Sequence, residues 1–447
     1  MVWGANPPGY KLKMRNPKDL KPEDRTSAQA KETLIKAEVE IDKSGCFFLP
    51  PEILAQLGAG PGTRLRVVKE NGQIRIEPNL QALRRLYLEP TSACNLACQT
   101  CIRHTWSEPL GSISRELVEK LAAGLKSFPF LQSIMLAGFG EPLVHPDIAW
   151  IVKRLKAASS ATIEITTNGT LLDEKLAQGL LEAGLDRLWV SFDGSSETSF
   201  NDIRRGANFN LVLRNVQRIR NLAAAMNKPF GLGISFVVMR ENINELKNIE
   251  KLIEATGADR LLITNVLPYT EEMERQMICP LALTCETFTG SPGKPQISLP
   301  RLDINYLTQE PIFHLLRGYE NLFLIDRPLS APSRSCRFIN EGMSFIRWDG
   351  QVAPCLALLH NNTTYLYGLE RRIRGYLLGD LNSRSLADIW SSQEYHDFRE
   401  KVYLFDYSPC HICGGCSYLE KNEEDCSGNT FPVCGGCLWA QSIIQCP

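Results

Sequence analysis

Three closely spaced cysteines are the residues of this sequence with the clearest capacity for chemistry. Cys94, Cys98 and Cys101 form a CxxxCxxC pattern shortly after the apolar segment 86–88. Soft thiolates at this spacing can hold three irons of a [4Fe–4S] cluster, and the absence of a fourth cysteine nearby leaves one iron open. The alternative is a group of incidental buried thiols. We therefore expect a cluster whose open iron binds a small molecule.

A second group of cysteines lies in the last quarter of the chain, where nine of the 15 fall between residues 336 and 446. A disulfide scaffold is the alternative to metal binding, but such scaffolds are usually short secreted chains. At four thiolates for each fully ligated [4Fe–4S] cluster, this group suffices for two clusters. The candidate ligands are Cys336, Cys355, Cys410, Cys413, Cys416, Cys426, Cys434, Cys437 and Cys446.

Other uses of the cysteines stay open. Two CxxC pairs, Cys410 with Cys413 and Cys434 with Cys437, would also suit a tetrahedral zinc ribbon. Outside both groups the chain has three further cysteines, which we interpret as structural residues: Cys46, Cys279 and Cys285.

The composition is that of a globular protein with more than one domain. The 447 residues exceed the roughly 250–300 at which a single hydrophobic core stops growing. With 44% hydrophobic residues, 22% charged residues and a net charge of −1, no overall charge directs the chain to nucleic acid. A membrane span and a signal peptide are not expected, because no long apolar run is present. Reduced thiolate ligands favour a cytoplasmic location.

Residues 84–268 contain the elements that must position the first cysteines. Apolar segments alternate there with amphipathic helices, which is the pattern of βα units. One helix is expected from Ile243 to Ile253 and to end at Gly257. Right-handed βα units curl into a barrel with functional groups at the C-terminal ends of the strands. We expect an α/β fold with a partial (β/α)6 barrel, whose strands are residues 85–89, 133–137, 162–167, 187–192, 233–239 and 260–266.

At the end of the first predicted strand, the CxxxCxxC loop resembles the defining motif of the radical S-adenosylmethionine (SAM) superfamily. The resemblance implies that SAM chelates the open iron through its amino and carboxylate groups. It also implies an electron donor such as ferredoxin or flavodoxin, and a reduced cluster that cleaves SAM to a 5′-deoxyadenosyl radical. That radical abstracts a hydrogen from the substrate, while the protein orients the parts and excludes side reactions.

Further segments resemble SAM-facing turns of this superfamily. Residues 138–142 resemble the GGEP turn, whose backbone meets the SAM amino group, although Phe139 replaces the first usual Gly. Residues 166–169 resemble the TTNG turn, and residues 191–194 resemble the S-x-D-G turn whose Ser bonds the ribose. The superfamily also has an Arg that can pair with the SAM carboxylate, and Arg204 resembles it. A plain turn or surface charge is the alternative reading. The expected cofactor-binding residues are Gly140, Glu141, Thr167, Asn168, Ser191, Asp193 and Arg204.

The C-terminal cysteines resemble a second known pattern. Cys336, Gly350 and Cys355 are spaced like the opening of the SPASM domain, which binds auxiliary [4Fe–4S] clusters. The resemblance implies one or two such clusters in residues 334–447. The spacings after Cys413 depart from the usual pattern, so the assignment of each cysteine to a cluster stays open.

Residues 34–80 form a predicted β-rich module after a tail at 1–33, and residues 269–333 are expected to be an irregular connector. The module resembles the AbrB/SpoVT/MazE swapped-hairpin domain, which commonly dimerises and binds DNA. Between residues 36 and 78 it has six basic and six acidic residues, a poor footprint for phosphates. We therefore expect docking or homodimer formation, with DNA binding as the alternative.

This order of parts resembles the radical SAM maturases of tungsten-cofactor oxidoreductases of the aldehyde ferredoxin oxidoreductase type. The implied partner is such an oxidoreductase or its pterin cofactor. One alternative is a SPASM enzyme that modifies a peptide, either sulfatase-maturase-like or thioether-forming. Another is a redox-sensing DNA-binding regulator, which would not turn over SAM.

Overall fold

A computed structural model describes most of the chain. The described residues are 49–60, 63, 65–70, 73–106, 108–278, 297–299, 322–324, 327–328, 336–408, 410, 416–441 and 443–447. The chain divides into two compact units, Met1–Gln56 and Leu57–Pro447. The predicted tail at 1–33, residues 34–48 of the predicted N-terminal module and most of the predicted connector lie outside the described residues, as do Cys46, Cys279, Cys285 and Cys413. In the first unit the description is limited to the start of helix α1 (Pro51–Leu57), whose first residue is a proline that needs no N–H partner.

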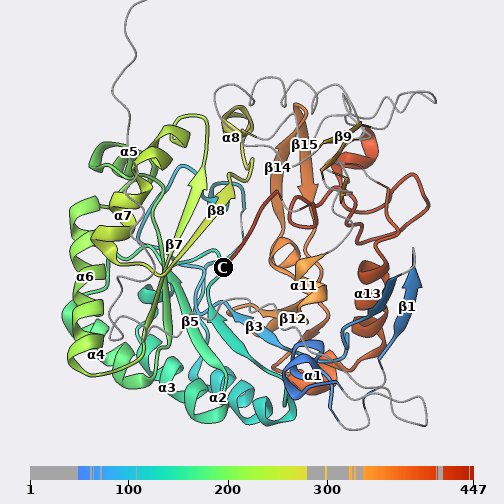
Figure 1. Ribbon diagram of the computed structural model, residues 1–447, viewed down its shortest axis with the longest axis horizontal. Coiled ribbons are helices and arrows are strands. Elements are labelled where there is room, and N and C mark those ends of the chain that lie inside the picture. The colour runs from blue at the N-terminus through green and yellow to red at the C-terminus, as the bar shows by residue number, and fades with distance from the viewer. Residues whose placement is uncertain are drawn as a thin grey trace, which may run out of the picture. The chain divides into compact units, whose positions relative to one another are not determined.

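A nine-stranded sheet organises the second unit, in the order β16-β13-β12-β3-β4-β5-β6-β7-β8 (Figure 1). Strands β3 to β8 run parallel to their neighbours, which confirms the predicted α/β fold. The prediction starts the fifth of these strands two residues late, because Gly231 already pairs with Arg187. The six strands are β3 (Arg85–Leu88), β4 (Ser133–Leu136), β5 (Thr162–Thr167), β6 (Arg187–Ser191), β7 (Gly231–Val238) and β8 (Arg260–Asn265).

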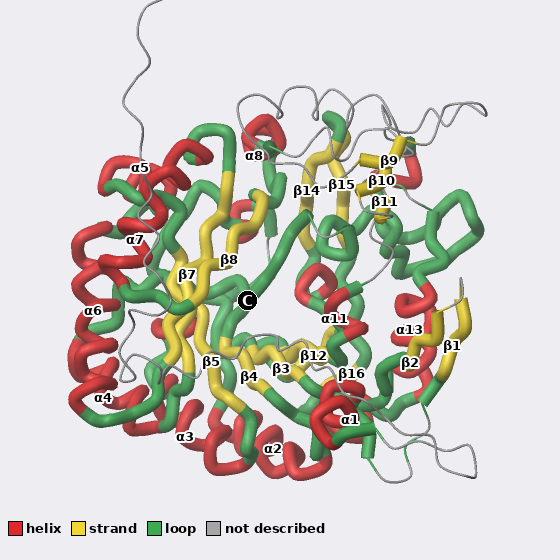
Figure 2. The backbone as a smooth tube through the Cα atoms, viewed as in Figure 1, coloured by secondary structure: helices red, strands yellow, loops and turns green. Residues whose placement is uncertain are grey.

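Helices cover the outer face of these strands, as Figures 1 and 2 show. Apolar strand residues such as Ile134 and Leu188 are fully buried in one core with helix residues such as Ile151 and Val216. Burial on both faces explains why β4 and β7 are almost continuously apolar in sequence. The helices are α2 (Arg115–Gly124), α3 (Ile148–Ala158), α4 (Glu174–Ala183), α5 (Glu197–Ile203), α6 (Phe209–Ala225) and α7 (Ile249–Thr256).

The helix predicted from Ile243 to Ile253 differs in its first half. Residues Ile243–Asn248 form a 3-10 helix, and the α-helix α7 begins only at Ile249. Ile243 is exposed rather than part of a buried face. The predicted end is confirmed, because Gly257 has a φ of 64° and caps α7 in the left-handed conformation.

The C-terminal region continues the same sheet. After helix α11 (Arg337–Asn340), strand β12 (Met343–Ile346) pairs in parallel with β3, and β13 (Gln351–Ala353) and β16 (Gly379–Asp380) follow at the edge. A separate hairpin and two helices complete the region. They are β14 (Asn362–Leu366), β15 (Leu369–Ile373), α12 (Leu386–Trp390) and α13 (Gln393–Leu404). The C-terminal region is therefore joined to the barrel strands by backbone pairing.

Two smaller elements bear on the other sequence predictions. Strands β1 (Val67–Glu70) and β2 (Gln73–Ile76) form an antiparallel hairpin, whereas the first was predicted three residues earlier, at 64–68. Within the predicted connector, a helix and a three-stranded sheet are described, so this region is not irregular throughout. They are α8 (Glu271–Gln276), β9 (Ile297–Leu299), β10 (Leu322–Leu324) and β11 (Arg327–Pro328). Among the described residues, no helix has the length and apolar character that crossing a membrane requires.

Candidate iron–sulfur and cofactor site

The first cysteine loop follows strand β3 and therefore begins at the C-terminal end of the parallel strands. Backbone hydrogen bonds fasten it to the segment after α5. Ala97 N donates to the Arg205 carbonyl (3.1 Å), and Gln99 N donates to the Ile203 carbonyl (2.9 Å). The loop ends in a short 3-10 helix, Ile102–His104. These contacts hold the cysteine loop at the C-terminal ends of the strands, where the sequence predicted an iron–sulfur cluster.

The thiols of Cys94, Cys98 and Cys101 are partly exposed and lie within electrostatic reach of one another. Burial is the main cause that raises the pKa of Cys98 to about 11, and the other two thiols add to the rise. Burial also raises the pKa of Cys101. Iron binding would replace the thiol protons, because metal ligands must be deprotonated. Three clustered, accessible thiols are the donor set that a [4Fe–4S] cluster with one open iron needs.

Gly140 lies against the start of the cysteine loop at a distance that excludes a side chain. A Cβ atom at this position would be 2.1 Å from the Thr91 carbonyl oxygen and 2.6 Å from that of Ala93. The following residue, Glu141, donates its N–H to the Ala93 carbonyl (2.8 Å). Packing between two protein segments therefore explains why glycine is needed here.

The carboxylate of Glu141 is buried and fully used within the protein. It accepts hydrogen bonds from Thr167 Oγ1 (2.6 Å), Asn168 N (2.7 Å) and Leu143 N (3.0 Å). Burial raises the pKa of Glu141, and these hydrogen bonds oppose that rise. Direct cofactor contact was expected for Glu141 and Thr167. In the structure their side chains join the turns after β4 and β5, and cofactor contact stays a prediction.

Asn168 links the turn after β5 to the cysteine loop. Its Nδ2 donates to Asn95 Oδ1 (3.0 Å) and lies 4.0 Å from the sulfur of Cys94. Asn95 in turn donates to Thr170 Oγ1 (2.8 Å). Of the expected cofactor residues, Asn168 is thus the one placed directly beside a cluster thiol by a hydrogen-bond contact.

Asp193 and Arg204 form a buried ion pair, with 2.9 Å between Oδ2 and Nη2. Burial disfavours the charge of Arg204, but Asp193 and the neighbouring Cys98 and Glu141 outweigh burial and raise its pKa. Arg204 Nε is buried and has no hydrogen-bond partner among the described residues. A bound anionic group beside the thiols would satisfy this donor, so the residues present suit the carboxylate of SAM.

Ser191 ends strand β6 and pairs in register with Ser235 of β7. Ser191 is half-buried, whereas the hydroxyl of Ser235 is buried and without a partner among the described residues. Ser235 was missed in the sequence because it stands inside an apolar strand and belongs to no motif. A polar molecule at this end of the strands would give its hydroxyl a partner.

Four of the C-terminal cysteines surround one cavity. Cys336, Cys355, Cys434 and Cys437 line a cavity of about 60 Å³, and all four lie in electrostatic range of at least one other. Burial is the main cause that raises the pKa of each thiol, that of Cys336 to about 12. Four thiols, two buried and two partly buried, around a cavity larger than one water are a suitable donor set for a fully ligated cluster.

Among the described residues, Cys410, Cys416, Cys426 and Cys446 do not line this cavity, although Cys446 packs against the same hydrophobic cluster. Cys410 is buried in a separate apolar cluster, and Cys416 and Cys426 are exposed. The sulfur of Cys446 accepts a hydrogen bond from Trp439 Nε1 (3.3 Å). Among the residues that the structure describes, no three His, Cys, Asp or Glu side chains are grouped for a single metal ion; Cys413, one of the four residues of the zinc-ribbon alternative, lies outside these residues. A four-iron cluster has the size to bridge thiols that are farther apart.

The comparisons with known proteins agree with this geometry. The sequence pattern of the Radical SAM superfamily matches residues 88–253, and that of SPASM, an iron–sulfur cluster-binding domain, matches residues 336–417. The chain belongs to the radical SAM superfamily and contains a SPASM domain. Within that class it is 30% identical, over 374 residues, to the tungsten-containing aldehyde ferredoxin oxidoreductase cofactor-modifying protein of Pyrococcus furiosus. This alignment covers 82% of the chain and 97% of the relative.

Other similar proteins share smaller parts or only the fold. A probable GTP 3′,8-cyclase of Methanococcus maripaludis is 30% identical over 197 residues, which cover 44% of the chain and 63% of the cyclase. The structure of Streptococcus suis SuiB bound to S-adenosylmethionine has 15% identity and a TM-score of 0.49, covering 76% of the chain and 72% of SuiB. The structure of anSMEcpe with bound AdoMet has 17% identity and a TM-score of 0.48, and the match covers 80% of this chain and 96% of anSMEcpe.

Membership in these two families confirms the predicted cofactors. They are a SAM-binding [4Fe–4S] cluster and auxiliary clusters, in a protein that is an enzyme.

Proposed function

We propose that this enzyme cleaves SAM at a cluster held by Cys94, Cys98 and Cys101. When bound, the reduced cluster and SAM supply a 5′-deoxyadenosyl radical for abstraction of a substrate hydrogen. The observation that carries the proposal is the position of three mutually close thiols on one loop beside an unsatisfied buried donor, Arg204 Nε. Asn168 beside Cys94 and the glycine contact of the Gly140 turn support the same assignment.

The protein residues around the cluster would bind and orient rather than react. Arg204 would pair with the SAM carboxylate while Asp193 holds its guanidinium in place. Gly140 would present its backbone to the amino group, and Glu141 would fix that turn through its three hydrogen bonds. Ser191 would form a hydrogen bond with the ribose of SAM, as its resemblance to the Ser of the S-x-D-G turn implies.

An auxiliary cluster is proposed for the cavity lined by Cys336, Cys355, Cys434 and Cys437. Cys336 and Cys355 are buried and Cys434 and Cys437 are partly buried, and burial raises the pKa of all four thiols. The remaining candidate ligands would serve a second auxiliary cluster if one forms: Cys410, Cys413, Cys416, Cys426 and Cys446.

The proposed biological role is maturation of a tungsten-cofactor oxidoreductase or its pterin cofactor. Its support is the Pyrococcus furiosus relative, because the alignment spans 82% of this chain and 97% of that protein. The peptide-modifying alternative uses the same barrel and cofactors. Transfer of electrons from ferredoxin or flavodoxin and homodimer formation stay predictions.

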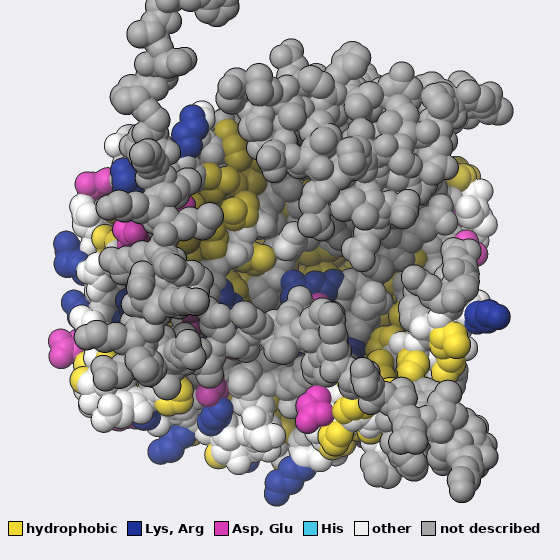
Figure 3. Space-filling model, viewed as in Figure 1, with side chains coloured by type: hydrophobic (Ala, Val, Ile, Leu, Met, Phe, Trp, Pro, Cys, Tyr) yellow, Lys and Arg dark blue, Asp and Glu magenta, His cyan; other side chains and the backbone are white. Residues whose placement is uncertain are grey.

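DNA binding by the N-terminal module is the less favoured alternative. On the face shown in Figure 3, basic and acidic side chains of the described residues are interspersed. A phosphate-binding surface would instead gather basic side chains on one face. The six basic and six acidic residues between 36 and 78 give the module no such excess of positive charge, so we keep catalysis as the function.

The test is anaerobic reconstitution followed by reduction in the presence of SAM. The expected products are 5′-deoxyadenosine and methionine, with about eight irons per chain for two clusters or about twelve for three. Adding the candidate oxidoreductase or its pterin cofactor should consume the radical and yield a modified product, whereas a precursor peptide should not. A chain that is loaded with iron and reduced but forms no 5′-deoxyadenosine would refute the proposal.

A further inference from the structure

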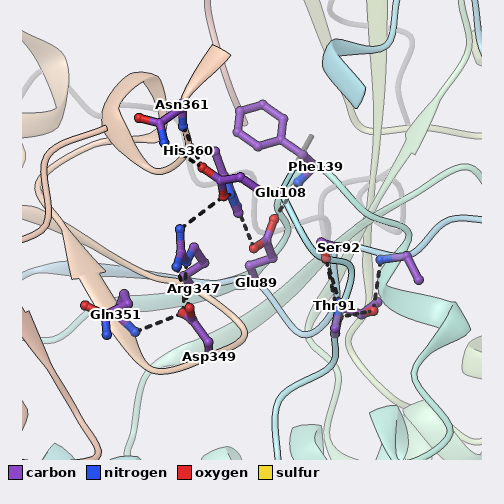
Figure 4. Close-up of polar contacts among 12 residues, drawn as sticks. Glu89, Thr91, Ser92, Glu108, Phe139, Arg347, Asp349, Gln351, His360 and Asn361 are labelled. Atoms are coloured by element: carbon purple, nitrogen blue, oxygen red, sulfur yellow. Dashed lines mark hydrogen bonds and ion pairs between the residues drawn. The ribbon is translucent and has the colours of Figure 1, made fainter. Parts of the chain in front are cut away.

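A buried chain of polar side chains connects the SPASM domain to the turn after β4 (Figure 4). His360, in the loop before β14, is 1% exposed. Its Nε2 lies 2.9 Å from Glu89 Oε2, and its Nδ1 lies 2.6 Å from Glu108 Oε2. The second oxygen of Glu89 accepts the backbone N–H of Phe139 (3.0 Å). One carboxylate thus joins the SPASM imidazole to the residue before Gly140.

Glu108, at the other end of this series of polar contacts, is also held in place. Glu108 Oε1 accepts hydrogen bonds from Asn361 N (3.0 Å) and Asn361 Nδ2 (3.1 Å). Arg347, which precedes β13, lies 3.2 Å from Glu108 Oε2 and pairs with Asp349. Figure 4 shows Asn361 and Arg347 of the C-terminal region on either side of Glu108, whose carboxylate lies against His360. The imidazole is therefore held in one orientation toward Glu89.

An aromatic contact runs beside the polar one. The ring of Phe139 lies 5.7 Å from that of His360 and 5.5 Å from that of Trp106, and Trp106 lies 4.3 Å from His360. All three pairs are edge-to-face, the geometry that aromatic rings prefer. The usual glycine at position 139 would have no side chain for this contact. The departure from the GGEP pattern thus places a ring against the SPASM domain.

We propose that His360 is a positioning residue through which the SPASM domain holds residues 138–142 in their SAM-binding geometry. The proposal rests on the proposed function, because it assigns the methionine amino group to this turn. Glu89 is fully buried, so loss of His360 would leave Glu89 Oε2 without its polar neighbour, the ring nitrogen 2.9 Å away. The carboxylate would then move, and it would take with it the N–H of Phe139.

Residues 138–142 are sensitive to small shifts because Gly140 is closely packed against the start of the cysteine loop. Gly140 has no space around its α-carbon, since a Cβ would meet the Thr91 carbonyl oxygen at 2.1 Å. A displacement at Phe139 is therefore passed to Gly140 rather than absorbed. SAM binding should respond to His360 although the histidine has no place among the proposed SAM contacts.

The experiment compares His360→Ala and His360→Gln with wild type in the full, cluster-loaded chain. KM for SAM and kcat for 5′-deoxyadenosine formation are measured together with iron per chain. We expect His360→Ala to raise KM for SAM about tenfold, the size of effect that supporting hydrogen-bond partners have, with unchanged iron. His360→Gln should recover part of the loss, because its amide can donate to one carboxylate.

The matched control is His396→Gln, since His396 is partly exposed on α13 and its charged neighbour is Asp397. It should leave KM and kcat at wild-type values. Phe139→Gly, alone and combined with His360→Ala, tests whether His360 acts through residues 138–142. If it does, KM for SAM in the double variant should rise by less than the product of the two single increases.

Three results would overturn the inference. They are an unchanged KM in His360→Ala, a loss of iron that accounts for the defect, and fully multiplicative effects in the double variant. Absence of SAM cleavage in the wild type would instead refute the proposed function, so the two failures are distinguishable.

Discussion

The guanidinium of Arg204 lies 2.9 Å from the carboxylate of Asp193, and both groups are buried beside the thiol of Cys98. Asp193 also accepts the N–H of Val237 (3.0 Å), which fixes the carboxylate from a second strand. A buried charge without a partner is costly, so each member of the pair stabilises the charged form of the other. The pair keeps one cation next to the thiolates that would bind iron.

Replacing Arg204 with Met should lower the free energy of unfolding by about 3–5 kcal/mol, because the buried carboxylate of Asp193 loses its partner. The matched control is Arg275→Met on α8, whose pair with Glu271 is exposed and is expected to contribute about 0–1 kcal/mol. Denaturant unfolding of both variants measures the difference. Equal stabilities for the two variants would show that the buried pair does not support the site.

The barrel could be predicted because its signals are local. Parallel strands covered on both faces are nearly continuous apolar segments, and a glycine such as Gly257 marks a helix end. The position of Cys94 after the first strand then follows from the general rule that such sites lie at the C-terminal ends of strands. These parts of the site needed no long-range information.

The remaining parts depend on contacts between distant segments. Strand β12 pairs with β3, and no periodicity in either segment indicates this partner. Glu89 and His360 are 271 positions apart, and neither belongs to a motif that names the other. Spacing likewise gave no reason to group Cys336 with Cys434 and to place Cys446 elsewhere. The fold of the tail decides these contacts.

Replacing Cys98 with Ala should abolish SAM cleavage, because the cluster would keep too few thiolate ligands on the loop. Anaerobic formation of 5′-deoxyadenosine is the measurement, and a loss of about four irons per chain should accompany the loss of activity. Ser159→Ala, at the C-terminal end of α3 and just before β5, lies near the opposite end of the strands; it is the control and should behave as wild type. Retained cleavage in the Cys98 variant would contradict the assignment of the cluster.

Double variants test whether the four C-terminal thiols that line the cavity share one cluster. Cys336→Ala and Cys434→Ala should each remove about four irons per chain and spare part of the uncoupled SAM cleavage at the first loop. Because both residues line the same cavity, the double variant should lose no more iron than either single variant. Iron analysis and electron paramagnetic resonance of the reduced protein measure this. If the double variant loses twice as much iron, the two cysteines belong to different clusters.

Gly140 and Gly124 form a pair of glycines with opposite expected responses to alanine. At Gly140 the added Cβ would meet the Thr91 and Ala93 carbonyl oxygens at 2.1 Å and 2.6 Å, so Gly140→Ala must displace backbone. We expect a destabilisation of about 1–3 kcal/mol from overpacking and weaker SAM binding. At Gly124, the last residue of α2, an added Cβ would meet no atom of the described residues within 4 Å, and alanine should stabilise the chain by about 0.5–1 kcal/mol. Thermal unfolding and SAM titration of both variants check the prediction. Because helix propensity raises stability at one site and steric overlap lowers it at the other, a shift of the same sign in both would contradict the close approach at Gly140.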